Sequence, residues 1–453
     1  STGPSPTYLL PERRPPSYDG ASSNERLKLL RVLGMNVVII GMGGVGFHVA
    51  KTLARGGHEV LAVDLDPRRI SHTAERLDVA TLRGYGANPR TLALAGVDKA
   101  DLVVCSTDSD EVNLIAALAS KQLGATRTVA RLQSGEYEDT EPGEDEEGLH
   151  YGMFGIDMVV NSHILAADEM FDIARSHGAL DVHMFANNRV ELAEVELPKD
   201  SAVLGVPLKD LRLPEQTRVG AVIRDGRLFM PRGRDALESG DRVYLFGQTG
   251  RMNAIEDLFV HGNSAQRVVI YGGNVIGEHL SRQLAKVGVE VLVIEPDRDR
   301  AQRLAKTLVR GNVVHGDCTD IDKLREEAVG RADLYFAVTE DDENNMMSAL
   351  LAKRLGTPRV CSVVHRPAYI AIYRELGLDM AISPRQVAAD HILRYSNPAQ
   401  IESVIHLGDG DAEVLEVVAA LESPITEAPL RNLTMPEGVT IGGIIGSDGV
   451  QIA

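Results

Sequence analysis

The chain of 453 residues is poor in the features that mark secreted, membrane-spanning or metal-binding proteins. It has no tryptophan, and its three cysteines, Cys105, Cys318 and Cys361, are odd in number and far apart. That pattern excludes a disulfide framework and is typical of a reducing, cytoplasmic compartment. Apolar runs such as 37–40 have the length of a strand, whereas a bilayer-spanning helix needs about 20 apolar residues. Prolines and charged residues near the start also interrupt any signal peptide.

The chain also lacks an excess of basic residues. Its 47 Lys and Arg face 65 Asp and Glu, which gives a formal net charge of -18. Nucleic-acid partners need a basic face, so this balance argues against them and against unaided adsorption to anionic lipid. The 13 histidines are dispersed without ligand spacing, so we predict no metal site. We also find no nucleophile–base pair and predict no catalytic residues.

What is present is a repeat. Residues 36–46 read NVVIIGMGGVG, and residues 267–277 read RVVIYGGNVIG. A Gly-rich turn that returns together with a downstream acid is far more specific than a single motif. The same offset of 231 residues separates Gly41 from Gly272, Gly46 from Gly277 and Asp64 from Glu295, and the offset between Thr107 and Thr339 is 232.

Each repeat alternates short apolar runs with amphipathic stretches, which indicates a parallel, doubly wound sheet. In the first repeat we expect strands at 37–40, 59–63, 102–106 and 128–132, with helices at 46–57, 67–77 and 111–123. Short alternating β patterns with turns follow each repeat. The predicted fold class is therefore α/β, with two tandem Rossmann-like domains, each followed by a small α+β domain.

We expect five segments along the chain: a disordered leader at 1–34, a Rossmann domain at 35–178, a small domain at 179–262, a second Rossmann domain at 263–397 and a second small domain at 398–453. Residues 136–147 are strongly acidic and are expected to form a solvated loop. Residues 218–230 align with 440–452, but the first copy continues for about 17 residues in strand patterns. The second small domain is therefore expected to be truncated.

The first Gly-rich motif predicts a dinucleotide cradle. Gly41 permits the tight turn, Gly43 allows the backbone to approach a diphosphate, and Gly46 lets the helix pack closely on the strand. The phosphates would lie on the N–H groups at the positive end of that helix. Asp64 would accept hydrogen bonds from ribose hydroxyls and disfavour a 2′-phosphate, which favours NAD over NADP. The residues expected at this site are Gly41, Met42, Gly43, Gly44, Val45, Gly46, Asp64, Thr107, Asp108 and Arg131.

The second motif departs from this pattern because Asn274 replaces the central glycine. Its side chain would crowd the approach of the phosphates, although asparagine tolerates left-handed backbone angles and so lets the turn survive. Val363 stands where the first repeat has Arg131. We expect this second site to be weaker, differently selective or empty. Its expected residues are Gly272, Gly273, Asn274, Val275, Ile276, Gly277, Glu295, Asp317 and Thr339.

The tandem arrangement closely resembles the TrkA family, the cytosolic regulatory subunits of Trk-type potassium uptake systems, built from RCK domains. The most specific pieces are the motif at 41–46 with Asp64, the segment STDSDEVN at 106–113, its second copy VTEDDENN at 338–345, and GID at 155–157. The 34-residue leader, Asn274 and the short C-terminus depart from the family pattern.

That resemblance implies a ring, commonly of four chains, on the inner face of the membrane beneath a potassium-translocating subunit. It implies NAD(H), ATP or ADP as regulatory ligands rather than substrates, and helices at 164–176 and 386–395 that pack across module interfaces. Two other interpretations remain open. An NAD-dependent oxidoreductase would need a substrate pocket and an acid or base near the nicotinamide, which we do not find; a scaffold would bind no nucleotide at all.

Overall fold

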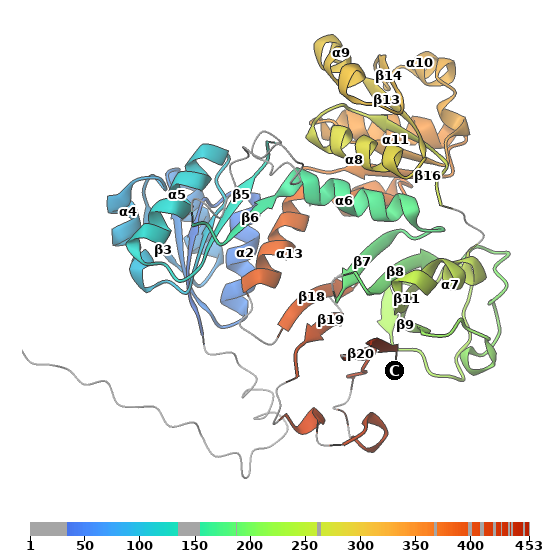
Figure 1. The fold of residues 1–453 in the computed structure, drawn as a ribbon, viewed down its shortest axis with the longest axis horizontal. Coiled ribbons are helices and arrows are strands. Elements are labelled where there is room, and N and C mark those ends of the chain that lie inside the picture. The colour runs from blue at the N-terminus through green and yellow to red at the C-terminus, as the bar shows by residue number, and fades with distance from the viewer. Residues whose placement is uncertain are drawn as a thin grey trace, which may run out of the picture.

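The fold is that of a computed structural model, which describes residues 34–134, 155–186, 188–260, 264–366, 369–396, 401–407, 412–419 and shorter stretches between 423 and 452. Residues 1–33 of the expected leader at 1–34 and the expected acidic loop at 136–147 lie outside the described residues. Two α/β lobes occupy the left and the upper right of Figure 1, and a smaller β domain lies below the second lobe.

The first lobe is a six-stranded parallel sheet in the order β3-β2-β1-β4-β5-β6. This is the strand order of a dinucleotide-binding fold, with the ligand edge at the carboxyl ends of β1 and β4. The predicted doubly wound sheet is confirmed. Its strands are β1 (Asn36–Ile40), β2 (Glu59–Asp64), β3 (Ala80–Arg83), β4 (Leu102–Cys105), β5 (Thr128–Leu132) and β6 (Met158–Asn161), and its helices are α2 (Gly44–Arg55), α3 (Pro67–Arg76), α4 (Pro89–Leu94) and α5 (Asp110–Leu123).

Local sequence explains the central elements of this lobe. Strand β1 is buried from Val37 to Ile40 because helices cover both faces of the sheet, and a continuous apolar run satisfies both. Helix α3 begins where the Asp66 side chain accepts a hydrogen bond from the Arg68 N–H, with Pro67 as its first residue. Strand β3 lies at the edge and is only half-buried, so it has no apolar run that would predict it.

The second lobe repeats the sheet in the order β14-β13-β12-β15-β16-β17, again with all strands parallel. Its strands are β12 (Arg267–Tyr271), β13 (Glu290–Glu295), β14 (Asn312–His315), β15 (Leu334–Ala337), β16 (Arg359–Val363) and β17 (Met380–Ile382). Its helices are α8 (Val275–Lys286), α9 (Arg298–Thr307), α10 (Ile321–Glu326), α11 (Asp342–Leu355) and α12 (Ile370–Glu375). The sequence repeat is therefore a structural repeat.

Between the lobes in sequence lies a five-stranded antiparallel sheet in the order β10-β9-β11-β8-β7. Its elements are β7 (Asp181–Phe185), β8 (Val190–Glu196), β9 (Thr217–Arg224), β10 (Arg227–Phe229), β11 (Arg242–Gln248) and α7 (Met252–Phe259). After the second lobe come two separate hairpins, β18 (Ile401–Leu407) with β19 (Ala412–Val417) and β20 (Gly443–Gly446) with β21 (Gly449–Ile452). Ile405 and Leu407 pack against the five-stranded sheet.

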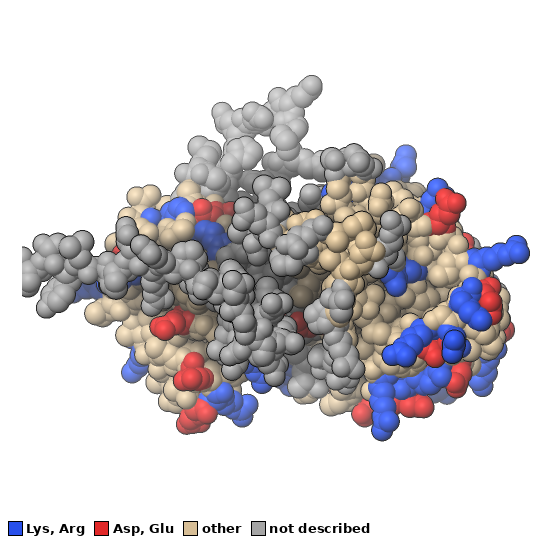
Figure 2. Space-filling view, turned by 90° about the horizontal axis from the view of Figure 1, so that it is seen from below, with Lys and Arg blue, Asp and Glu red and all other residues tan. Residues whose placement is uncertain are grey.

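The 3₁₀ turns are Val97–Lys99, Leu208–Asp210, Thr249–Arg251, Val329–Arg331, Pro424–Thr426 and Leu430–Asn432. On the face shown in Figure 2, Lys and Arg side chains lie interspersed with Asp and Glu, which is typical of a solvated surface. All three cysteines are free and buried. Among the described residues, no helix combines the length and the apolar character that crossing a bilayer requires.

Two crossover helices exchange places between the lobes. Helix α6 (Ser162–Arg175) leaves the first lobe and packs on α8 of the second, and α13 (Pro384–Ser396) leaves the second lobe and packs on α2 of the first. Figure 1 shows α6 running between the lobes, with α13 beside α2. Ala388, Ala389 and Ile392 of α13 are fully buried in the core of the first lobe. The exchange that the resemblance implied is confirmed within this chain.

Paired arginines hold the far ends of these helices. The Arg127 guanidinium donates to the carbonyl oxygens of Tyr395 (2.9 Å) and Ser396 (3.3 Å) at the end of α13. Arg359, 232 residues later, donates to the Ile173 carbonyl oxygen (3.5 Å) near the end of α6. Cations at the carboxyl end of a helix complement its dipole. Each lobe therefore anchors the crossover helix of the other.

Candidate functional site

The first Gly-rich turn joins β1 to α2 at the carboxyl edge of the sheet. Gly41 has a φ of 94°, and a Cβ atom built there would lie 2.6 Å from the Thr107 nitrogen. A Cβ atom at Gly46 would lie 1.9 Å from the Gly41 carbonyl oxygen. Backbone packing therefore requires glycine at both positions, as predicted.

Gly43 is different, because the fold does not need a glycine there. Its φ is -73°, an angle that any residue adopts. The nearest atoms to a Cβ atom at Gly43 would be Arg69 Nη1 at 3.6 Å and Asp108 Oδ1 at 3.8 Å. The space in front of this backbone is open to an incoming group. The cradle therefore fits a diphosphate, and the backbone N–H groups of Gly43 to Val45 would hold it.

The side chains of Met42 and Val45 are buried in the core of the first lobe. In the second lobe, Ile276 is likewise fully buried. Only the backbone of these positions could therefore contact a ligand, and the Met42 N–H already donates to the Asp64 carboxylate at 2.6 Å. Because Gly44 has no side chain, Arg385 from the second half of the chain lies close to the surface of α2. A Cβ atom at Gly44 would be 3.1 Å from Arg385 Cδ.

Asp64 holds the turn in place. Its carboxylate accepts hydrogen bonds from the N–H groups of Met42 (2.6 Å) and Asp66 (2.8 Å), and the residue is 8% exposed. The predicted ribose-binding acid therefore already connects the end of β2 to the Gly-rich turn. A carboxylate has about four lone-pair sites, so hydrogen bonding to ribose hydroxyls remains compatible with this geometry.

Sequence reasoning missed Arg69 of α3, which bridges the front of the cradle. Its guanidinium pairs with Asp108 at 3.0 Å and lies 3.7 Å from Asp64. Asp108 is 65% exposed, so this bridge contributes little stability and an incoming ligand can displace it. The available signal was an arginine in the first turn of the helix that follows the ribose-binding acid.

Asn113 positions the ends of β4 and β5. Its Oδ1 accepts hydrogen bonds from the Thr107 N–H and from Thr107 Oγ1, both at 2.7 Å, and its Nδ2 donates to the Arg131 carbonyl oxygen at 2.8 Å. The predicted ligand residue Thr107 therefore uses its hydroxyl within the fold. Thr107 and Arg131 lie side by side at the cradle, as predicted from their places after β4 and in β5.

Arg131 is a buried cation whose hydrogen bonding is incomplete among the described residues. It is only 4% exposed, and its Nε has no hydrogen-bond partner among the described residues. Its Nη1 donates to the Thr107 carbonyl oxygen at 3.4 Å. Burial lowers the pKa of this guanidinium, and nearby Asp108 partly opposes the shift. Buried cations are normally paired, so this arginine indicates an anion at the site.

In the second lobe, Gly272 has a φ of 111° and a Cβ atom at Gly277 would lie 1.9 Å from the Gly272 carbonyl oxygen, so the turn is the same. Asn274, however, has a φ of -74°, nearly identical to that of Gly43. The prediction that left-handed tolerance preserves this turn was wrong, because the position is extended in both lobes and the left-handed residue is the first glycine.

The Asn274 side chain fills the place that a phosphate would take. Its Oδ1 accepts a hydrogen bond from the Gly277 N–H at 3.2 Å, which caps α8. Its Nδ2 donates to the Val338 carbonyl oxygen (2.6 Å) and to Glu340 (3.1 Å). The crowding expected from the sequence is therefore an ordered cap that brings a carboxylate to the helix N-terminus.

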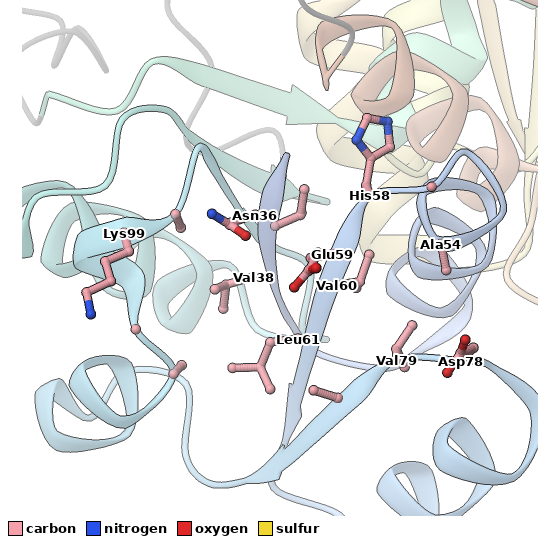
Figure 3. A pocket seen from close by; sticks show the side chains of 16 residues that line it. Asn36, Val38, Ala54, His58, Glu59, Val60, Leu61, Asp78, Val79 and Lys99 are labelled. Carbon is pink, nitrogen blue, oxygen red and sulfur yellow. The ribbon is translucent and has the colours of Figure 1, made fainter. Parts of the chain in front are cut away.

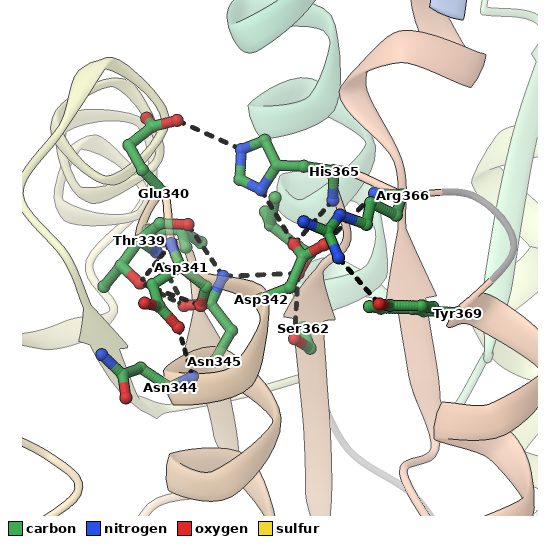
Figure 4. A network of polar contacts seen from close by, with 12 residues as sticks. Thr339, Glu340, Asp341, Asp342, Asn344, Asn345, Ser362, His365, Arg366 and Tyr369 are labelled. Atoms are coloured by element: carbon green, nitrogen blue, oxygen red, sulfur yellow. Dashed lines mark hydrogen bonds and ion pairs between the residues drawn. The ribbon is translucent and has the colours of Figure 1, made fainter.

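Glu340 belongs to a charged network beside this cap (Figure 4). His365 Nε2 lies 3.2 Å from Glu340 and its Nδ1 lies 2.9 Å from the buried Asp342. The His365 ring lowers the pKa of Glu340 to about 2, and Glu340 in turn raises the pKa of His365. A carboxylate held ionised here repels a diphosphate.

The other acids of the second lobe are engaged within the fold. Glu295 is 1% exposed and accepts hydrogen bonds from the N–H groups of Gly273 (2.5 Å) and Asp297 (2.7 Å). Asp317 accepts hydrogen bonds from Tyr271 Oη at 3.0 Å and from the Thr319 N–H at 2.8 Å. Burial alone would raise the pKa of Asp317, but these hydrogen bonds outweigh it and lower the pKa.

Thr339 repeats Thr107, since its N–H (2.9 Å) and Oγ1 (2.6 Å) both donate to Asn345 Oδ1. The second Gly-rich turn faces the segments that follow β4 and β5 of the first lobe across a cavity of about 520 Å³. Val275 of the second motif lies in its wall. The lining residues are Asp108, Ser109, Asp110, Glu111, Gln133, Ser134, His163, Asn274, Val275 and Glu340.

A second cavity, of about 650 Å³, lies at the opposite edge of the first sheet (Figure 3). Asn36 and Glu59, at the starts of β1 and β2, line it together with His58 and Lys99. Ligands of open α/β sheets bind at the carboxyl ends of the strands. We therefore assign the nucleotide site to the Gly-rich edge and not to this cavity.

Solved structures share the fold. The GsuK RCK domain aligns with a TM-score of 0.59 at 19% identity, covering 80% of this chain and 76% of that chain. A GsuK channel bound to NAD aligns with a TM-score of 0.58 at 20% identity, covering 79% and 63%. At these identities the likeness concerns the fold, and it agrees with the predicted pair of Rossmann-like domains.

Sequence relatives cover nearly the whole chain. A Trk system potassium uptake protein TrkA homolog of Archaeoglobus fulgidus is 33% identical over 411 residues, which is 91% of this chain and 92% of the relative. The Trk system potassium uptake protein TrkA of Azorhizobium caulinodans is 32% identical over 418 residues, 91% of each. Neither name describes an enzyme, which agrees with the prediction of no enzymatic activity.

The TrkA-N domain model matches residues 37–162 and 268–384, and the TrkA-C domain model matches residues 192–260. The two TrkA-N matches coincide with the two parallel sheets, and the TrkA-C match lies on the five-stranded sheet. Together with the relatives, these matches confirm the resemblance predicted from the motifs: the chain belongs to the TrkA family.

Proposed function

We propose that this chain is the regulatory subunit of a Trk-type potassium uptake system and that a nucleotide bound to its first lobe controls the membrane partner. The observation that carries the proposal is the first cradle. The space in front of Gly43 is open there, and the buried Arg131 of the same lobe has incomplete hydrogen bonding. The names of the relatives support potassium uptake as the process.

The proposed ligand is an adenine nucleotide, NAD(H), ATP or ADP. Relatives in fold support this class, since one GsuK structure is bound to NAD and another, with a TM-score of 0.50, is bound to ADP. The ligand would supply negative charge to the N–H groups of Gly43 to Val45 and to Arg131, and Asp64 would accept hydrogen bonds from its ribose hydroxyls. We propose that the second lobe, with Asn274 and Glu340 at its helix N-terminus, binds a nucleotide weakly or not at all.

Control of the partner needs no chemical step. A ligand shifts an equilibrium between two shapes only through its different affinities for them. The exchanged helices connect such a ligand to the second half of the chain. Helix α2 begins at the Gly-rich turn, and α13 of the second half packs on α2. Closure of the first lobe on a nucleotide would therefore change how the two halves sit together, and the membrane partner would respond to that change.

We further propose that four chains form a ring on the cytoplasmic face of the membrane, held there by the potassium-translocating subunit. The five segments expected from the sequence, 1–34, 35–178, 179–262, 263–397 and 398–453, remain our proposed division of each chain. A nucleotide that binds one shape of the ring tenfold more tightly than another shifts the equilibrium between them by about 1.4 kcal/mol per site. The contributions of several equivalent sites in a ring would add.

The test combines binding with transport. Isothermal titration of the full chain with ATP, ADP and NADH should give binding in the wild type and none in Gly43→Asp, whose carboxylate would occupy the cradle. Asn274→Asp is the matched control in the second lobe and should keep the binding. Potassium flux through the reconstituted transporter should respond to nucleotide with the wild type and with Asn274→Asp, but not with Gly43→Asp; wild-type flux that ignores every nucleotide would overturn the proposal.

A further inference from the structure

At the amino-terminal edge of the second sheet, one arginine joins two elements. Arg267 is the first residue of β12. Its Nε lies 3.6 Å from the carboxylate of Glu290, the first residue of β13, and its Nη2 donates to the Glu327 carbonyl oxygen at the end of α10 at 3.1 Å. A cation suits both a carboxylate and the carboxyl end of a helix. The guanidinium therefore occupies the space between the strand starts and α10.

The first lobe has the same backbone frame, but Asn36 stands in place of Arg267. Each of these residues opens the central strand and lies opposite the glutamate that opens the next strand. The backbone N–H of each also donates to an aspartate, Asp101 at 2.8 Å in the first lobe and Asp333 at 2.9 Å in the second. The two positions are therefore structurally equivalent, and the first lobe lacks the guanidinium.

The acceptors that Arg267 uses in the second lobe remain in the first without a side chain to serve them. Glu59 is the counterpart of Glu290, and among the described residues its carboxylate has no ion-pair or hydrogen-bond partner. Ala95 follows α4 as Glu327 follows α10. No side chain in the described part of the chain donates to the Ala95 carbonyl oxygen. The first lobe thus keeps the acceptors of a guanidinium and not the guanidinium itself.

The space that the missing arginine leaves is part of the cavity of about 650 Å³ shown in Figure 3. Small-molecule sites typically have volumes of about 300–1,000 Å³. Val38, Leu61 and Val79 give this cavity an aliphatic wall, and Glu59 and Asp78 give it carboxylates. Long basic groups place an aliphatic stem on such a wall and keep their charged end at the polar rim. The lining therefore suits a cation on an aliphatic stem.

The basic residues in the wall of the cavity do not replace the missing charge. Lys99 points away from Glu59 (Figure 3). The Met35 N–H donates to His58 Nδ1 at 3.2 Å, and burial lowers the pKa of this histidine. A ring nitrogen that accepts a hydrogen bond carries no proton, so His58 is neutral in this arrangement. The positive charge that Arg267 supplies in the second lobe therefore has no substitute here.

We propose that this cavity binds a guanidinium group on an aliphatic chain, with Glu59 and the Ala95 carbonyl oxygen as its acceptors. The planar guanidinium has five N–H donors, so one group serves a carboxylate and a carbonyl oxygen together, as Arg267 does. Val38 and Leu61 would pack against the aliphatic chain. The site lies at the opposite edge of the sheet from the Gly-rich turn, so the inference does not depend on the proposed function.

Two sources carry this chemical group. One is a free alkylguanidine, and the other is an arginine side chain from residues 1–33. Gly34, which follows those residues, lies beside the cavity, because a Cβ atom there would be 3.0 Å from the carbonyl oxygen of the lining residue Gly57. The arginines concerned are Arg13, Arg14, Arg26 and Arg31.

The experiment is NMR titration of the full chain with n-butylguanidinium, in which the methyl resonances of Val38 and Leu61 report binding. Saturable binding to the wild type supports a free ligand. Binding that appears only after the four arginines of residues 1–33 are changed to glutamine supports occupation by one of them. In whichever of these two proteins binds, Glu59→Gln should weaken binding at least about tenfold, as loss of a charged hydrogen bond implies. Glu290→Gln is the matched control and should leave binding unchanged.

A second variant refills the cavity in the way that the second lobe does. Asn36→Arg should abolish binding of n-butylguanidinium, because its own guanidinium would take the place of the ligand, whereas Asn36→Gln should retain binding. Asn36 is exposed, so both variants should fold, and the thermal midpoint of Asn36→Arg should be no lower than that of the wild type.

Three results would overturn the inference. The first is the absence of saturable binding both in the wild type and in the variant with the four glutamines. The second is unchanged binding in Glu59→Gln, or an equal loss in Glu290→Gln. The third is a folded Asn36→Arg variant that binds n-butylguanidinium as well as Asn36→Gln does.

Discussion

Asn113 and Asn345 occupy the same position in the two lobes, and each joins the end of the fourth strand to the end of the fifth. Both side chains are fully buried. Asn113 Oδ1 accepts from the Thr107 N–H and its Nδ2 donates to the Arg131 carbonyl oxygen. Asn345 makes the same contacts with Thr339 (2.9 Å) and Val363 (3.3 Å). The same side-chain contacts thus shape the cradle edge in both lobes, although the Gly-rich turns beside them differ.

Asn113→Leu should lower the free energy of unfolding by about 2–4 kcal/mol, because it leaves buried donors and acceptors at residues 107 and 131 without partners. Chemical denaturation measures the loss. Nucleotide affinity should fall as well, since Thr107 and Arg131 would no longer be held together. Asn345→Leu is the matched change in the second lobe, and we expect a similar loss of stability with nucleotide affinity unchanged. A fully stable Asn113→Leu variant would contradict this account.

The sequence was sufficient to predict both lobes, because repeated strands, Gly-rich turns and acids are local patterns. It did not predict the part of the site that depends on how distant segments meet. Arg385 lies over Gly44, yet the two are far apart in sequence and no periodicity links them. Strand β3 and helix α4 were missed for a different reason, since both are short and β3 lies half-exposed at the edge of the sheet.

Asn274 shows how a correct expectation can rest on an incorrect reason. The replacement of the central glycine was correctly identified as the main departure of the second motif. The backbone angle at this position, however, is extended in both lobes, so the fold itself does not require glycine at Gly43. That distinction between glycines needed by the fold and by a ligand cannot be obtained from the spacing of the motif.

The same distinction gives a second prediction. Gly46→Ala should destabilise the first lobe by about 3 kcal/mol or more, because its Cβ would collide with the Gly41 carbonyl oxygen and neither strand nor helix can move freely. Gly277→Ala should do the same in the second lobe. Gly43→Ala meets no atom closer than 3.6 Å and should keep its thermal midpoint while losing nucleotide affinity. Equal destabilisation by all three changes would show that the cradle is only a structural turn.

A third prediction concerns the charged network of Figure 4. The lowered pKa of Glu340 means that its contribution to stability is present above its ordinary value of 4.5 and is lost as the pH falls toward about 2. The raised pKa of His365 means that its contribution is present below 6.5 and is lost as the pH rises through the folded value. The pair should therefore stabilise the fold most between about pH 4.5 and 6.5.

Glu340→Gln should lower the pKa of His365 toward its ordinary value, which NMR titration of the ring protons measures directly. Glu343→Gln removes an equal charge from the exposed first turn of α11 and serves as the control; it should leave the His365 titration nearly unchanged. If the two substitutions shift His365 equally, general electrostatics rather than the Glu340 contact sets its pKa, and the assigned role of Glu340 in repelling a diphosphate loses its support.

The buried acids of the TrkA-C sheet give the last prediction. Glu191 on β8 is 7% exposed, and burial raises its pKa to about 8, with further contributions from Glu256 and Asp172. The unfolded chain releases this proton near 4.5 while the folded chain keeps it, so stability should fall as the pH rises from about 4.5 to 8. Glu191→Gln should reduce that slope, to which Glu256 and Asp172 also contribute through their raised pKa values. The variant should be more stable than the wild type at pH 8 by about 2–4 kcal/mol, with little difference at pH 5. Urea denaturation across this pH range measures the slope and the difference between the variants. Glu196 is exposed on the same strand, so Glu196→Gln should follow the wild type. A wild type whose stability rises over the interval would show that Glu191 is already ionised in the fold.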